Sequence, residues 1–250
     1  MGLGRHFRLE LIAVTNTSPP RWRSASAVAL AMLTDLALYL VKMAAVVALA
    51  VFLLELFVGP ARAASIPKAA DQHRATLIRT AHAVWGLDAP VAVFAGQIHA
   101  ESRWNPNAKS HAGAEGLAQF MPATAAWLPS IAPETGKPLP YNPGWAIRAL
   151  VTYDLWLWKR TQADNDYEQM AFTLSKYNGG ETRLNREMRM AEVNGYSPGR
   201  WFGHVERFNA GRSASNKREN QEYPRKILQD FQWRYADAGW GAGLPEPERQ

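Results

Sequence analysis

Several features that are common in other proteins are missing from this sequence of 250 residues. It contains no cysteine, so its folded core has to be stable without disulfide bonds. It also has no extended alternation of apolar and polar residues, no βαβ rhythm and no internal repeat. Its six histidines are dispersed, and no cluster has metal-ligand spacing. These absences exclude a disulfide-stapled or β-rich protein and leave an all-α fold as the expectation.

Acidic residues are in the minority, since 22 of them stand against 28 basic residues and the net charge is +6. Residues 1–63 hold six of the basic and three of the acidic residues, so the remainder carries a net charge of +3. The arginines and lysines are scattered and form no basic stripe, which predicts no nucleic-acid partner. A mild positive charge suits an anionic polymer surface such as a cell wall.

One long apolar run lies near the N-terminus. Between residues 25 and 58 nearly every residue is apolar, and the charged interruptions are Asp35, Lys42 and Glu55. Basic residues precede this run, which predicts that the N-terminus stays in the cytoplasm and the rest of the chain is exported to the periplasm. These residues are Arg5, Arg8, Arg21 and Arg23.

Three interpretations of residues 1–63 are open. Small residues at Ala61 and Ala63 fit the pattern after which signal peptidase cuts, which favours a cleaved signal peptide. An uncleaved helix of about 20 apolar residues would instead anchor the protein in the inner membrane. A buried hairpin of a soluble protein is the third interpretation, but no other part of the chain supplies a matching apolar surface. Met32 and Met43 are alternative first residues.

The rest of the chain has helical periodicity. Glycine and proline punctuate it, and residues 129–144 form a proline-rich surface loop. We therefore expect one all-α domain over residues 68–236 and a disordered tail over residues 237–250. The expected helices cover residues 71–86, 87–102, 122–128, 144–160, 166–180, 181–193, a short segment around 201–208, and 218–238.

The stretch "AESRWNPNAKSHAGAEGLAQFMP", residues 100–122, places Glu101 at the end of an apolar helix. Apolar packing solvates a carboxylate poorly, so the pKa of Glu101 is expected to rise until the group holds a proton near neutral pH. Such a carboxyl group in a cleft can act as a general acid. Gly113 and Gly116 would let the following loop pass close to the helix end. Taken alone, Glu101 also fits a helix-end residue paired with Arg103.

Residues 101–125, "ESRWNPNAKSHAGAEGLAQFMPATA", resemble the signature of the soluble lytic transglycosylases, the SLT domain with a goose-type lysozyme-like fold. "YNPGWAIRALVTYDLWL" (141–157) resembles the D/N-P-x-x-N-I helix of that family. "KYNGG" (176–180) is similar to its A-Y-N-A-G motif, and "ENQEYPRKIL" (219–228) to its E-T-x-x-Y-V segment. The resemblance covers residues 72–235 and implies an all-α, lysozyme-like domain.

The resemblance also implies roles for the matching residues. Glu101 would be the sole catalytic acid/base, and seven further residues would bind or frame the substrate: Ser110, Gln119, Met121, Tyr177, Asn178, Glu219 and Tyr223. Ser110 would contact the substrate or shape the loop. Other interpretations of three of these residues stay open: Gln119 satisfied by backbone groups, Tyr177 in the core, and Glu219 exposed on a charged helix.

The chemistry implied by the resemblance is cleavage of the β-1,4 bond between N-acetylmuramic acid and N-acetylglucosamine in peptidoglycan strands. Ordinary glycosidases use two carboxyl groups, and the sequence offers no convincing partner for Glu101, because Glu115 is expected to point to solvent. The 6-hydroxyl of the muramoyl sugar would therefore attack its own anomeric carbon and form a 1,6-anhydro product, with no metal or cofactor. The alternatives are a muramidase that uses water and a non-catalytic component of phage, pilus or secretion machinery.

The chain departs from the family pattern around the far side of the expected groove. Lys176 and Gly179 replace the usual alanines, Asn220 replaces threonine, and Pro224 replaces a β-branched residue within the last helix. These departures weaken the assignment of a role to Glu219 more than the assignment of Glu101 as the catalytic residue.

Overall fold

The computed structural model describes residues 25–57 and 66–247. Within these ranges the secondary structure is helical, and the β-type pairing is limited to two isolated bridges, Lys109 with Glu115 and Glu115 with Phe120. The all-α class predicted from the sequence is confirmed. The α-helices are α1 (Ala25–Phe57), α2 (Arg74–Trp85), α3 (Val91–Ser102), α4 (Pro122–Trp127), α5 (Pro143–Lys159), α6 (Asp166–Gly179), α7 (Glu181–Val193), α8 (Ala214–Arg225) and α9 (Gln232–Asp237). The 3₁₀ segments are η1 (Lys68–His73), η2 (Leu128–Ser130), η3 (Pro133–Thr135) and η4 (Val205–Arg207), and η5 (Lys226–Phe231) is π-helical.

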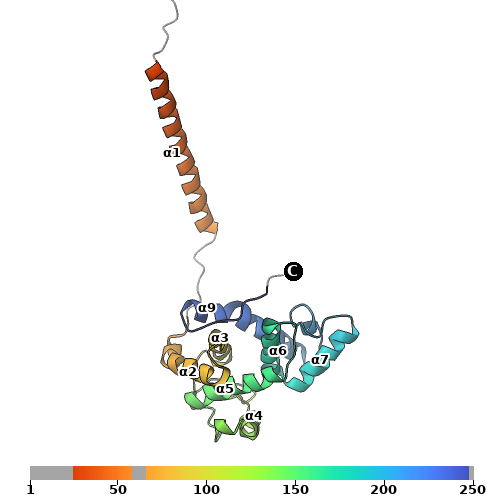
Figure 1. Ribbon diagram of the computed structural model, residues 1–250. Helices are drawn as coiled ribbons and strands as arrows, with labels where there is room; N and C mark the ends of the chain where they lie inside the picture. Colours follow the sequence, from red (N-terminus) through yellow and green to blue (C-terminus); the bar gives the residue numbers. More distant parts are fainter. Residues whose placement is uncertain (1–24, 58–65, 248–250) are drawn as a thin grey trace, which may run out of the picture. The chain divides into compact units, whose positions relative to one another are not determined.

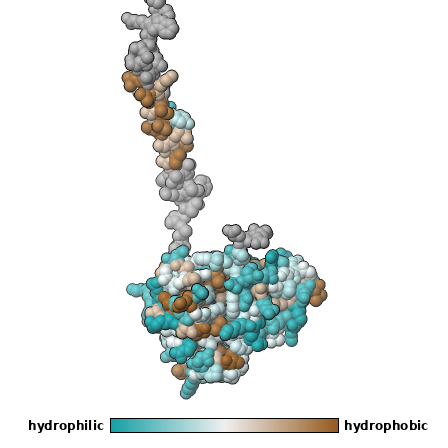
Figure 2. All heavy atoms as spheres, in the orientation of Figure 1, coloured by the Kyte–Doolittle hydropathy of each residue, from teal (hydrophilic) through white to brown (hydrophobic). Residues whose placement is uncertain are grey.

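Helix α1 belongs to a separate unit of the chain, Met1–Arg62, and the other helices belong to the unit Ala63–Gln250. Apolar side chains between Leu30 and Leu49 of α1 are exposed, as Figure 2 shows, and the stretch Met32–Leu49 is long and apolar enough to cross a membrane. A signal sequence has the same properties. The apolar helix expected from the sequence is therefore present, whereas the predicted cleavage pattern at Ala61 and Ala63 lies outside the described residues.

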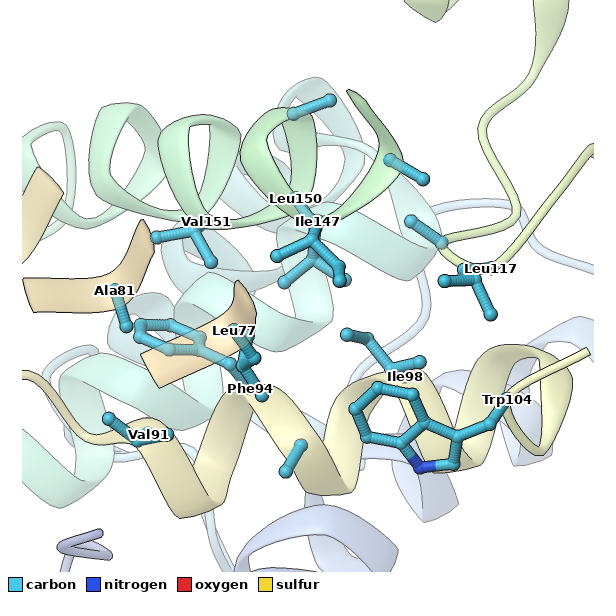
Figure 3. Close-up of a cluster of buried hydrophobic side chains, with 14 of the residues drawn as sticks. Leu77, Ala81, Val91, Phe94, Ile98, Trp104, Leu117, Ile147, Leu150 and Val151 are labelled. Carbon is cyan, nitrogen blue, oxygen red and sulfur yellow. The ribbon is translucent and has the colours of Figure 1, made fainter. Parts of the chain in front are cut away.

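The second unit is built around α3, which contacts α2, α9 and η5. Residues Val91–Ile98 are buried on every side of this helix, since none of them is more than marginally exposed. Figure 3 shows Phe94 and Ile98 of α3 facing Leu77 of α2 and the apolar side of α5. A helix that is apolar all round has to lie inside a domain, and Figure 1 shows α3 surrounded by its neighbours. Glu101 is thus carried by the most deeply buried helix of this unit.

The last helical run, α8–η5–α9, contains an irregular segment. Pro224 lies inside α8, where a proline removes a backbone hydrogen bond and crowds the preceding turn. A π-helical turn follows directly, over Lys226–Phe231. This turn lies against Gly96 of α3, where an added Cβ would come within 3.1 Å of both Gln232 N and Phe231 Cβ. The glycine therefore allows the close approach that brings the cleft-facing residues of α8 beside α3.

The prediction of a disordered tail over residues 237–250 is wrong for the part of it that the structure describes. Trp240 is buried in the main core cluster, at 3% exposure. Gln232 holds the tail from inside: its Nε2 donates to Leu244 O at 2.8 Å, and its Oε1 accepts from Leu244 N at 2.8 Å. The burial of a tryptophan side chain and two hydrogen bonds from one side-chain amide stabilise the tail, despite the polar composition that suggested disorder. Residues 248–250 lie outside the described residues.

Candidate active site

The chain reverses direction immediately after Glu101. Helix α3 ends at Ser102, and Arg103 and Trp104 adopt left-handed backbone conformations with φ of 51° and 64°. Such conformations cost energy in residues other than glycine, and they persist only where the surroundings enforce them. Here the Trp104 side chain is completely buried, and its Nε1 donates to Tyr235 Oη at 2.6 Å. The core contacts of Trp104 thus hold the reversal that exposes the end of α3 to the cleft.

The loop after this reversal is fastened by short-range bonds. Ser102 Oγ donates to Leu117 O at 2.8 Å, which ties the loop back to the end of α3. Gly116 has φ of 76°, and a Cβ there would lie 1.8 Å from Pro140 O. Gly113, with φ of 90°, has open space around it and is needed only for its conformation. The expected close approach of the loop therefore exists at Gly116, but the backbone it approaches is that of Pro140 and not the helix end.

A cleft of about 590 Å³ opens beside Glu101. Its walls come from the end of α3, the loop before α4, α6 and α8, segments that lie far apart in the sequence. Every site residue predicted from the sequence lines it: Glu101, Ser110, Gln119, Met121, Tyr177, Asn178, Glu219 and Tyr223. Tyr153, Lys176, Glu222 and Lys226 also line it and were not predicted.

Glu101 is partly accessible from the cleft and is otherwise surrounded by protein. This burial raises the pKa of its carboxyl group to about 8. The hydroxyl of Tyr223 donates a hydrogen bond to Glu101 Oε1, which lowers the pKa, and the negative charge of Glu219 raises it again. The net result is a carboxyl group that holds its proton at neutral pH and can release it within the range where proteins work.

Tyr177 connects α6 to the loop. Its hydroxyl donates to Ala118 O at 2.6 Å, and burial raises the pKa of this phenol well above its ordinary value. Phe120 packs against the Tyr177 ring, with centroids 5.7 Å apart. Tyr177 therefore lines the cleft and also packs into the core, so the two interpretations of this residue both describe its surroundings.

Asn178 and Glu219 meet across the cleft. Asn178 Nδ2 donates to Glu219 Oε1 at 3.2 Å, while Asn178 Oδ1 accepts from Asn220 Nδ2 at 3.1 Å. Asn220 is buried, and a Cβ on Gly179 would lie only 2.6 Å from its Nδ2. Two departures from the family pattern thus compensate each other, because Gly179 leaves the space that the longer Asn220 side chain occupies.

The polar groups of the loop are largely used by the loop itself. Gln119 has φ of 47°, and its Nε2 donates to Gly116 O at 2.9 Å and to Ala108 O at 3.2 Å. Ser110 Oγ accepts from Ala114 N at 2.9 Å, so it shapes the loop. Met121 is 43% exposed and offers an apolar surface to the cleft.

Sequence reasoning missed a second carboxyl group near Glu101. Asp154 of α5 is completely buried and accepts a hydrogen bond from Gln97 of α3. Its position follows Ile147, Leu150 and Val151 with the spacing of one helix face, and this periodicity was the signal that could have revealed it. Glu115, in contrast, is partly exposed and pairs with Lys109 at 3.3 Å. Across residues 25–57 and 66–247, no group of three or more acidic or histidine side chains is placed to hold a metal ion.

One family model matches part of the chain. Residues 78–198 match the family model described as the transglycosylase SLT domain. Among solved structures, the 70 kDa soluble lytic transglycosylase SLT70 from Escherichia coli is 21% identical, with a TM-score of 0.47 over 67% of this chain and 24% of that one. The complex of the 70 kDa soluble lytic transglycosylase with bulgecin A is 20% identical, with a TM-score of 0.49 over 69% of this chain and 25% of that one. The chain thus spans about a quarter of the length of these proteins, and no curated protein matched it.

Proposed function

We propose that this chain, which belongs to the SLT transglycosylase family through residues 78–198, is a lytic transglycosylase that cleaves the glycan strands of peptidoglycan. The scissile bond is the β-1,4 bond between N-acetylmuramic acid and N-acetylglucosamine. The observation that carries the proposal is the state of Glu101, a carboxyl group in a cleft whose pKa is raised to about 8 by burial.

Glu101 performs both proton transfers of the reaction. Its protonated carboxyl group gives the proton to the glycosidic oxygen, and the bond from that oxygen to the muramoyl anomeric carbon breaks. The Glu101 carboxylate then takes the proton of the muramoyl 6-hydroxyl, whose oxygen bonds to the same carbon. The products are a 1,6-anhydromuramoyl end and a free 4-hydroxyl, no water is consumed, and Glu101 is protonated again.

Tyr223 supports the first half of this cycle, in which Glu101 gives up its proton. Its hydroxyl donates to Glu101 Oε1 and stabilises the charged carboxylate, which lowers the pKa that burial has raised. Without this hydrogen bond, the pKa of Glu101 would be higher, and the group would be a weaker acid in the first proton transfer. Tyr223 therefore balances the two roles of one carboxyl group.

The remaining residues of the cleft are proposed to bind the sugars. Gln119 and Asn178 line the cleft, and their side-chain amides are of the kind that binds sugar hydroxyl or acetamido groups. Met121 supplies an exposed apolar face, and Tyr177 and Ser110 hold in place the loop that carries Gln119 and Met121.

A second candidate function is that of a muramidase, which uses water as the nucleophile. One observation favours it. A two-carboxylate mechanism needs a second carboxyl group that reaches the sugar. Asp154 is completely buried and cannot do so, but Glu219 lines the same cleft and contributes to the pKa of Glu101. Asn178 already binds Glu219 Oε1, which favours a role for Glu219 in sugar binding.

The site of action is proposed to be the periplasm. The apolar helix α1 and the preceding arginines support export across the inner membrane, with the helix acting as a cleaved signal or as a retained anchor. We propose residues 1–63 as this segment and residues 68–236 as the catalytic domain. A role within phage or secretion machinery would use the same cleft.

The test is the release of soluble fragments from purified peptidoglycan. Glu101→Gln keeps the size of the side chain but removes the transferable proton, so release should fall by at least a hundredfold. Glu115→Gln makes the same chemical change in the partly exposed carboxylate that pairs with Lys109, and activity should be retained. Undiminished release by Glu101→Gln, with Glu115→Gln also active, would contradict the proposed function.

A further inference from the structure

A buried carboxyl group that the proposed reaction does not use lies beside the helix that carries Glu101. Asp154 of α5 and Gln97 of α3 are both fully buried, and Gln97 Nε2 donates to Asp154 Oδ1 at 3.3 Å. Gln97 precedes Glu101 by four residues, so the two side chains lie on the same side of α3, one turn apart. The contact therefore joins α5 to the turn of α3 directly before Glu101.

Each partner in this contact has one oxygen without a hydrogen bond. Gln97 Oε1 and Asp154 Oδ2 are both buried, and neither has a partner among the residues that the structure describes. If Asp154 were ionised, both oxygens would be acceptors and neither could satisfy the other. A proton on Oδ2 turns that oxygen into a donor, and Gln97 Oε1 is the open acceptor of the same pair. A carboxylic acid and a primary amide then make two reciprocal hydrogen bonds.

The surroundings of Asp154 also favour its protonated form. Burial raises the pKa of Asp154 well above its ordinary value, the Gln97 hydrogen bond lowers it, and the charge of Glu101 raises it further. In the described parts of the chain, none of the ion pairs involves Asp154. The ionisable groups that face it from the packed helices are acids or phenols: Glu101 on α3, Tyr153 on α5, Tyr177 on α6 and Tyr223 on α8.

We propose that Asp154 is a positioning residue that keeps its proton at neutral pH and forms a reciprocal acid–amide pair with Gln97. The pair fixes the turn of α3 before Glu101 and places no second negative charge beneath the cleft. A charged Asp154 would raise the pKa of Glu101 and hinder the loss of its proton. The inference rests on the proposed function in one respect only, that Glu101 is the group whose proton affinity matters.

The first test measures the titration of Glu101 in the full-length Asp154→Asn variant, by the carboxyl-carbon NMR signal of Glu101. The asparagine amide replaces the protonated oxygen as the donor to Gln97 Oε1, and it cannot ionise. Because Asp154 is already neutral, the titration midpoint of Glu101 should move by less than about 0.3 pH units, and the alkaline limb of the activity profile should stay in place. A fall of the midpoint by about one unit or more would show an ionised Asp154 and overturn the proposal.

The second test reads Asp154 itself. Its carboxyl-carbon signal, identified by its loss in Asp154→Asn, should be that of a protonated acid at about pH 6, far above the ordinary pKa of aspartate. The signal of an ionised carboxylate at this pH contradicts the proposal.

The pairing is tested by three variants. Asp154→Leu leaves the Gln97 amide unpartnered and should lower Tm by several degrees, and Gln97→Leu should do the same by leaving the acid alone. The double variant removes both polar groups and should recover most of the loss. Losses that simply add would contradict the pair.

The NMR and Tm readouts do not depend on turnover. If the full chain cleaves no peptidoglycan while both NMR results are as expected, the proposed function fails and the pair stands. If cleavage depends on Glu101 but Asp154 is ionised, the proposed function stands and the pair fails.

Discussion

Replacing Glu101 with glutamine should stabilise the protein, by an amount that grows with pH. The pKa of Glu101 is about 8 in the folded chain, against 4.5 for the exposed group in the unfolded chain. Between these two values the folded state holds a proton that the unfolded state has lost, so the free energy of unfolding falls as the pH rises through this window. The stability that this bound proton adds to the folded state is complete below the lower pKa and lost above the higher one.

The size of the effect follows from the two pKa values. At 1.36 kcal/mol for each unit, the ionisable Glu101 costs less than about 1 kcal/mol at pH 5, roughly 3 kcal/mol at pH 7 and roughly 5 kcal/mol above pH 8. Glutamine has the same shape, still accepts the hydrogen bond from Tyr223, and does not titrate. The variant should therefore exceed the wild type by these amounts.

The assay is urea unfolding of the full chain in a mild detergent, followed by tryptophan fluorescence at several pH values. Other buried groups titrate as well, since burial lowers the pKa of His99 to about 4. The relevant quantity is thus the difference between variant and wild type, in which such contributions cancel. A difference that stays constant from pH 5 to pH 9, or a variant less stable than the wild type at pH 8, would refute the claim that Glu101 is poorly solvated.

Four further variants test the site and the packing of the domain. Tyr223→Phe removes the hydrogen bond that lowers the pKa of Glu101, so the alkaline limb of the pH profile of kcat/KM should move upward by about one unit; an unmoved limb contradicts this role. Gly116→Ala combines a left-handed φ with a collision against a backbone oxygen and should cost at least about 3 kcal/mol in urea unfolding, whereas Gly113→Ala, with open space, should cost about 1–2 kcal/mol; equal costs would show that the collision is relieved. Trp240→Ala should cost about 3–5 kcal/mol by the same assay, and a loss below about 1 kcal/mol would mean that the tail does not pack in the core.

Local patterns were enough to predict α3 and the position of Glu101. A run of apolar residues that ends in one carboxylate and a glycine-marked loop is a short-range signal, and the structure places Glu101 in a cleft with a raised pKa. Gathering the other predicted residues into one group depended on the family resemblance. No periodicity relates residue 110 to residue 219. Their shared cleft arises only when α6 packs on α8 and the η5 turn that follows α8 packs on α3.

What escaped prediction depends on contacts between distant segments. The left-handed Trp104 is held by a bond to Tyr235, more than a hundred residues later, and nothing in the local sequence specifies it. The ordered tail depends on Gln232 reaching Leu244 from inside the core. Asp154 differs from these, because its place on the apolar face of α5 was visible in the sequence and pointed to a buried acid.

The central claim is that one carboxyl group suffices because the substrate supplies its own nucleophile. The most direct measurement is digestion of purified peptidoglycan in water labelled with heavy oxygen, with mass spectrometry of the released fragments. We expect 1,6-anhydromuramoyl ends that carry no label and are lighter by one water molecule than reducing ends. Labelled reducing ends as the main product would contradict it and would point to Glu219 as the second carboxylate.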